Sequence, residues 1–195
     1  MIPTGLADRI VALPGSRVVV AIVGPPASGK STLAAALVDA LPGAALVPMD
    51  GFHLDDAVLG PRGLLPVKGA PETYDVGGLS RLLDALRAGR DAYAPVFDRS
   101  LELSRAAARH VPFGARVVVV EGNWLLLDAP GWRDVGPFDL SVRLDVPDDV
   151  LRARLEDRWA ALDPAARAAK IDGNDLPNAR RMRVESRAAD VVVEG

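Results

Sequence analysis

Eight residues near the start of the chain, G-P-P-A-S-G-K-S over positions 24–31, constrain its fold more than any other part of the sequence. They follow an apolar, mostly β-branched run at 18–23 and precede a helix-type pattern at 32–38. A strand that leads into a glycine-containing loop and then directly into a helix brings backbone N–H groups and the positive end of the helix dipole to one point. The pattern therefore predicts an anion-binding loop of the size that a polyphosphate needs.

Each position of this loop has an expected role. We expect Lys30 to reach the β- and γ-phosphates and the Ser31 hydroxyl to hold Mg²⁺. The alternative is a chance glycine loop with a surface lysine, which the strand and helix on either side of it disfavour. The expected nucleotide-binding set comprises Gly24, Pro25, Pro26, Ala27, Ser28, Gly29, Lys30, Ser31 and Thr32.

Strand-like and helix-like patterns alternate along the chain. The strand-like runs are Arg17–Val23, Ala45–Met49, Arg116–Val120, Leu140–Asp145 and Ala189–Val193. Most are continuously apolar, as in strands buried on both faces of a parallel sheet. Helix patterns cover Leu6–Leu13, Ser31–Leu41, Leu79–Ala88 and a segment that starts near Pro147. We predict an α/β fold: a three-layer α/β/α domain over 1–195, with a five-stranded parallel sheet and helices on both faces.

Three segments depart from this rhythm. Residues 51–75 are rich in Gly, Pro and Asp without clear periodicity, and 93–103 is a second irregular segment. Long ordered loops in compact domains tend to be functional, so we expect both to bind the acceptor. Residues 165–179 are a third candidate, a mobile region, and we expect a lid near 152–179.

Composition excludes several classes of function. The net charge of −3 argues against a basic nucleic-acid-binding face, and the absence of cysteine excludes disulfides, thiolate metal sites and cysteine nucleophiles. No apolar run approaches the roughly 20 residues that span a bilayer. Asp8 and Arg9 interrupt the first apolar stretch, so it lacks a signal-peptide core. We expect a cytoplasmic protein with a small-molecule substrate, no nucleic-acid or membrane partner, and leave a homodimer open.

Two carboxylates stand where predicted parallel strands end. The carboxyl ends of such strands form the ligand crevice of open α/β sheets. There Asp50 could orient an attacking hydroxyl and accept its proton, or it could simply cap a turn. Glu121 occupies the position that binds Mg²⁺ or a substrate hydroxyl in phosphate-binding-loop proteins, the alternative being a solvent-exposed strand end.

Other charged residues give weaker signals. Arg152, Arg154 and Arg158 follow the fourth strand, and a fixed guanidinium there could stabilise a transferring phosphoryl group. Neighbouring acidic residues make a salt-bridged surface the alternative. His53 belongs to the same segment as Asp50, and we expect His110 to lie on the surface. These two isolated histidines lack the spacing of metal ligands.

Taken in order, these motifs resemble the uridine kinase, phosphoribulokinase and bacterial pantothenate kinase family, with most similarity to bacterial fructose-transport-associated or nucleoside/nucleotide kinase-like proteins. The matching segments are 24–31, M-D-G-F-H at 49–53, K-G-A-P-E-T-Y-D at 68–75, P-V-F-D-R at 95–99 and E-G at 121–122. The chain lacks the extended C-terminal portion of pantothenate kinases and the H-x-R that usually follows P-x-Y-D in uridine kinases.

The resemblance implies a role for each matching residue. Asp50 would be the catalytic base, Arg158 a lid arginine, and Asn178 would lie near the adenine. The residues implied to line the acceptor pocket are His53, Tyr74, Asp98 and Arg99, with Glu121 serving either Mg²⁺ or the acceptor.

Together these features predict a kinase that uses ATP and Mg²⁺ to phosphorylate a hydroxyl of a sugar, a nucleoside or a pantothenate-like alcohol. A nucleotide kinase with a phosphate acceptor would need more basic residues than Arg62 and Lys68 in 51–75. A nucleotide-dependent regulatory ATPase or switch is the alternative from another functional class.

Overall fold

A five-stranded parallel sheet forms the centre of the computed structural model, which describes residues 1–195. The sheet consists of β1 (Val18–Val23), β2 (Ala45–Pro48), β5 (Val117–Gly122), β6 (Leu140–Asp145) and β7 (Val191–Glu194). Their order is β2-β5-β1-β6-β7, and all neighbours are parallel. The predicted fold class and all five predicted strands are confirmed, with ends shifted by one or two residues.

Both faces of the sheet are covered, which explains the continuous apolar runs. Alternate residues of β1 enter two separate cores: Val18, Val20 and Ile22 pack with helices α1 (Leu6–Val11) and α2 (Lys30–Ala40). Residues Val19, Ala21 and Val23 enter the larger core on the other face, which includes α4 (Val76–Arg87) and Trp124.

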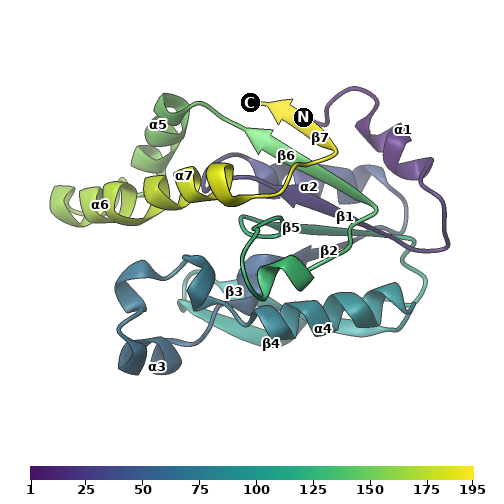
Figure 1. Cartoon of the computed structure of the whole chain (residues 1–195), viewed down its shortest axis with the longest axis horizontal. Helices are drawn as coiled ribbons and strands as arrows, with labels where there is room; N and C mark the ends of the chain where they lie inside the picture. The colour runs from purple at the N-terminus through teal and green to yellow at the C-terminus, as the bar shows by residue number, and fades with distance from the viewer.

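Three further helices form a separate unit beyond the carboxyl ends of the strands (Figure 1). They are α5 (Asp148–Arg158), α6 (Pro164–Lys170) and α7 (Leu176–Glu185), the last two joined by a π-helical turn over Ile171–Asp175. Residues of α5, the π-helical turn and α7 share a small core with Val146, to which α6 contributes no buried residue. Residues 165–179, predicted as a mobile region because of Gly173, Asn174 and Pro177, are therefore helical.

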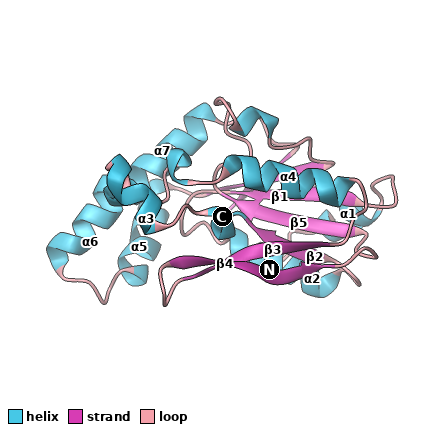
Figure 2. Ribbon diagram, turned by 90° about the horizontal axis from the view of Figure 1, so that it is seen from below, coloured by secondary structure: helices cyan, strands magenta, loops and turns pink.

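A hairpin replaces the second irregular segment. Strands β3 (Ala92–Asp98) and β4 (Leu103–Val111) pair antiparallel, and the prediction of an irregular segment over 93–103 is wrong. The hairpin lies at the edge of the molecule beside β2 (Figure 2). By contrast, 51–75 is irregular as predicted: short 3-10 turns surround the four-residue helix α3 (Asp56–Leu59). None of the helices combines the length and the apolar character that crossing a membrane requires.

Candidate active site

The predicted phosphate-binding loop joins β1 to α2 in a conformation that larger residues would disturb. A Cβ atom at Gly24 would lie 2.5 Å from Ser28 Oγ, and Gly29 has a φ of +92°. Ala27 also has a positive φ, of 62°. Lys30 is the first residue of α2, directly after this loop. The sequence therefore folds here into a tight loop at a helix N-terminus, the arrangement that binds phosphate groups.

Ser31 and Glu121 meet beneath the loop. Ser31 Oγ donates a hydrogen bond to Glu121 Oε2 at 3.1 Å, and Glu121 is only 5% exposed. Burial raises the pKa of the Glu121 carboxyl, and the positive charge of Lys30 opposes that shift. A hydroxyl and a carboxylate are hard oxygen donors of the kind Mg²⁺ prefers. No group of three or more His, Asp or Glu side chains is placed to hold a metal, so an ion here would take its other ligands from phosphate and water.

Asp50 lies in a 3-10 turn that continues from β2. Arg99 Nη2 donates to Asp50 Oδ2 at 2.8 Å. Burial alone would raise the pKa of this carboxyl, but the positive charges of Lys30, Arg99 and Arg158 outweigh it and hold the pKa of Asp50 below its usual value. Asp50 is therefore ionised at neutral pH, as a proton acceptor must be.

Aromatic rings form the wall behind Asp50. The His53 ring centroid lies 4.1 Å from that of Tyr74 and 4.8 Å from that of Phe97. His53 Nδ1 is 2.7 Å from the carbonyl oxygen of Asp50, which can only accept, so Nδ1 carries the proton. Burial lowers the pKa of His53 despite the nearby carboxylate, which leaves the ring neutral at pH 7.

The helical unit supplies the facing wall. Trp159 Nε1 donates to Asp175 Oδ2 at 2.8 Å, and the cationic groups of Arg158 and Lys170 lie 5.2 and 5.7 Å from the Trp159 ring centroid. Burial and the charge of Arg99 lower the pKa of Arg158. The guanidinium nevertheless keeps its charge, because arginine is not deprotonated in proteins.

Amide hydrogen bonds connect the two walls. Asn174 Nδ2 donates to the carbonyl oxygen of Lys68 at 2.9 Å, and Asn178 Nδ2 donates to Asn174 Oδ1 at 3.0 Å. Lys68 itself donates to Asp56 Oδ1 at 2.6 Å and to the Glu102 carbonyl oxygen at 3.0 Å. The irregular segment 51–75, the hairpin and the helical unit are thus linked around one space.

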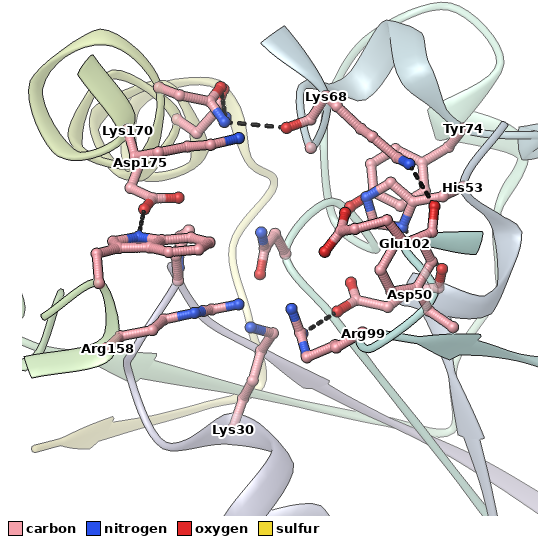
Figure 3. A pocket seen from close by; sticks show the side chains of 17 residues that line it. Lys30, Asp50, His53, Lys68, Tyr74, Arg99, Glu102, Arg158, Lys170 and Asp175 are labelled. Atoms are coloured by element: carbon pink, nitrogen blue, oxygen red, sulfur yellow. Dashed lines mark hydrogen bonds and ion pairs between the residues drawn. The ribbon is translucent and has the colours of Figure 1, made fainter. Parts of the chain in front are cut away.

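That space is one open, mainly polar pocket (Figure 3). Figure 3 shows Lys30 and Arg158 pointing into it across from Asp50 and Arg99, with Lys170 reaching in from the helical unit. The residues that line it are Pro26, Lys30, Asp50, His53, Lys68, Gly69, Tyr74, Phe97, Arg99, Glu102, Asn123, Arg158, Trp159, Lys170, Asn174, Asp175 and Asn178.

About half of the predicted site residues line this pocket, and the placements of Asp98 and Asn178 differ from expectation. Asp98 does not line it: its carboxylate accepts hydrogen bonds from Ser100 and Arg105 at the hairpin turn. Asn178 lies in the same pocket as Asp50. Ala27, Ser28, Gly29 and Thr32 border a second depression on the other side of the loop, with Arg154, Leu144 and the C-terminal Gly195.

Sequence reasoning missed several pocket residues. Lys68 and Phe97 lie inside the segments predicted to bind the acceptor, and Asn123 comes two residues after Glu121. Their positions in the sequence could therefore have indicated that they line the site. The residues from the helical unit fall inside the predicted lid near 152–179, but no feature of the sequence gave them individual roles. The missed residues are Lys68, Gly69, Phe97, Glu102, Asn123, Trp159, Lys170, Asn174 and Asp175.

No family model matches the chain. The uncharacterized Escherichia coli protein YggC is 39% identical over 190 residues, which span 93% of this chain and 79% of YggC. A Schizosaccharomyces pombe protein described as a proposed uridine kinase is 31% identical, over 91% of this chain and 83% of its own length. The pantothenate kinase of Mycolicibacterium vanbaalenii is 34% identical over 71% of this chain, but the match spans only 45% of that enzyme.

Structural similarity agrees with these relatives. The crystal structure of a proposed fructose transport system kinase from Silicibacter sp. TM1040 superposes with a TM-score of 0.89 at 46% identity, covering 97% of this chain and 95% of that one. Because the similarity covers nearly the full length of both chains, it includes the phosphate-binding loop, the sheet and the helical unit. The chain belongs to the family of P-loop kinases that includes proteins named uridine kinase and pantothenate kinase.

Proposed function

We propose that the protein transfers the terminal phosphoryl group of ATP, with Mg²⁺, to a hydroxyl group of a small metabolite. The observation that carries this proposal is that Lys30 of the phosphate-binding loop and the ionised Asp50 line the same pocket. A kinase needs a cation at the triphosphate and a proton acceptor at the attacking hydroxyl, within reach of one phosphorus atom.

The residues divide the chemistry between them. Asp50 orients the hydroxyl and takes its proton while the hydroxyl oxygen bonds to the γ-phosphorus and the bond to the bridging oxygen of ADP breaks. Lys30 and Arg158 stabilise the negative charge that spreads over the transferring group. Ser31 and Glu121 would hold Mg²⁺, which supplies further positive charge at the phosphates.

The charges around Asp50 favour an alcohol over a phosphate as the acceptor. Lys68 pairs with Asp56 at 2.6 Å and Arg99 pairs with Asp50 at 2.8 Å, so two of the cations on the acceptor side already have carboxylate partners. A phosphate acceptor would need free guanidinium or ammonium groups there. A pocket beside the proposed base also supports transfer rather than a regulatory ATPase, since a switch that only hydrolyses ATP needs no binding site for an acceptor.

ADP release from ATP and Mg²⁺ tests this function. Each of a panel of sugars, polyols, nucleosides, nucleoside monophosphates and pantothenate is added to the purified protein, and ADP is measured in a coupled assay. We expect release that depends on an alcohol. Release stimulated only by a nucleoside monophosphate would indicate a nucleotide kinase, and equal release with and without every compound would indicate a regulatory ATPase.

A further inference from the structure

Asn123 is the pocket residue with a buried polar atom that has no partner. Its side chain is 8% exposed, and its Oδ1 makes no hydrogen bond. Leaving an amide oxygen buried without a donor costs stability, and such groups in folded proteins call for a specific explanation. A ligand group that donates a hydrogen bond in this pocket would supply the missing partner.

Asn123 and Asp50 follow two neighbouring strands and line the same pocket. Glu121 is paired with Pro48 in the parallel register of β5 and β2. Two residues beyond these partners, the chain reaches Asn123 just after β5 and Asp50 in the 3-10 turn after β2. A hydroxyl held at Asp50 therefore brings the adjacent part of the same molecule to Asn123.

Two other polar side chains in the pocket limit which functional groups the bound molecule can carry. Asn178 uses its Nδ2 to donate to Asn174, and its Oδ1 has no hydrogen-bond donor. Lys170 lies over Trp159 and makes neither a hydrogen bond nor an ion pair. The pocket thus offers one buried acceptor without a donor, Asn123 Oδ1, together with a second amide oxygen and an exposed ammonium group with which a ligand could also pair.

Hydroxyl groups match this set because each one both donates and accepts. A carboxylate or phosphate would only accept, and would leave the two amide oxygens unpaired. An alkyl chain would satisfy none of the three groups. A compound with several hydroxyls can pair with all three groups.

We propose that Asn123 is a specificity-determining residue whose amide oxygen accepts a hydrogen bond from a second hydroxyl of the acceptor, so that the substrate is a polyhydroxy compound of the sugar or polyol class. The inference rests on the proposed function, in which Asp50 holds the hydroxyl that is phosphorylated. It adds that a neighbouring hydroxyl is required for recognition.

Matched pairs of compounds test the proposal. Glycerol is compared with 1,3-propanediol, D-ribose with 2-deoxy-D-ribose, and D-fructose with 1-deoxy-D-fructose, both in ADP release and in thermal-shift binding. For at least one pair we expect the wild-type protein to prefer the fuller member by fivefold or more, the size that one hydrogen bond supplies. Asn123→Leu should abolish that preference while leaving the KM for ATP unchanged.

Stability separates recognition from a structural role. Leucine has the same branched arrangement of four side-chain heavy atoms as asparagine and removes the unpaired oxygen, so the melting temperature of Asn123→Leu should be equal to or above that of the wild type where its larger methyl groups are accommodated. Asn123→Ala is the second variant if leucine is not accommodated. Ser186→Ala is the control, because Ser186 Oγ is also buried without a partner but does not line the pocket.

Three results would overturn the proposal: no polyhydroxy compound binds, both members of every pair behave alike, or Asn123→Leu raises the KM for ATP instead of weakening the acceptor. These results are distinguishable from failure of the proposed function. Binding of a polyol that depends on Asn123 but gives no ADP would refute the kinase proposal alone. Phosphorylation of a compound with a single hydroxyl, unaffected by Asn123→Leu, would refute the role of Asn123 alone.

Discussion

Replacing Asp50 by Asn removes the proposed proton acceptor with almost no change in shape. The amide cannot take a proton from the attacking hydroxyl, and loss of a general base lowers turnover by about 10²- to 10⁴-fold. This corresponds to roughly 3–5 kcal/mol of activation free energy. The KM for ATP should stay within about twofold, because the proposed function assigns the triphosphate to the loop that begins at Gly24 and to Lys30 rather than to Asp50.

The effect of this substitution on stability should be much smaller. Asp50→Asn breaks the ion pair with Arg99, whose side chain is 60% exposed while that of Asp50 is 24% exposed. Exposed pairs of this kind contribute about 0–1 kcal/mol. The pKa of Asp50 is lowered in the folded protein, so its stabilising contribution is present above the usual value of about 3.8 and is lost as the pH falls below it. At pH 7 the melting temperature should therefore fall by no more than a few degrees.

Steady-state ADP release, measured with an active acceptor over a range of ATP concentrations, provides the assay. Asp98→Asn is the matched control, since Asp98 undergoes the same chemical change nearby but does not line the pocket. Full turnover in Asp50→Asn would refute the reasoning. An equal loss in both variants would show that the effect comes from disturbing the hairpin.

Three further predictions concern single residues. Lys30→Ala should reduce kcat/KM by 10²-fold or more, because the substitution removes a group that stabilises the charge of the transition state. The circular dichroism spectrum should be unchanged. Retention of ATP-dependent transfer would contradict the role of Lys30. Glu121→Gln should raise the melting temperature at pH 7, because burial raises the pKa of Glu121 and its ionised form destabilises the fold. This gain in melting temperature should vanish as the pH falls toward 4.5. A melting temperature at pH 7 below that of the wild type would contradict the prediction. Gly51→Ala should lower the melting temperature by several degrees, because the added Cβ would lie 2.2 Å from the carbonyl oxygen of Pro95. Such overpacking costs about 1–3 kcal/mol of stability. An unchanged melting temperature would disprove the close contact.

The parallel sheet was predictable because its strands are buried on both faces. Val117–Val120 is apolar without interruption, and no helix or exposed strand needs such a run. Strand β4 gave no comparable signal. Its sequence L-S-R-A-A-A-R-H-V contains a single β-branched residue, most of its side chains are exposed, and Ala107 has a positive φ where its pairing with β3 is irregular. Contact with the sheet, which sequence patterns do not report, stabilises this hairpin.

Residues at strand ends were predictable for a geometric reason. Asp50 and Glu121 follow parallel neighbours, and parallel strands end at the same edge of a sheet. The residues of the helical unit were different, because a helix pattern specifies a buried stripe but not what its polar face meets. Lys170 and Asp175 line the pocket only because the π-helical turn joins α6 to α7 above it.

A crystal structure of the protein with Mg²⁺ and a non-hydrolysable ATP analogue tests the central claim most directly. The proposed function predicts the terminal phosphorus between Lys30 and Asp50, with Ser31 near the metal and space for an alcohol beside the Asp50 carboxylate. A nucleotide bound away from the 24–31 loop, or a terminal phosphate that fills the space beside Asp50, would contradict it.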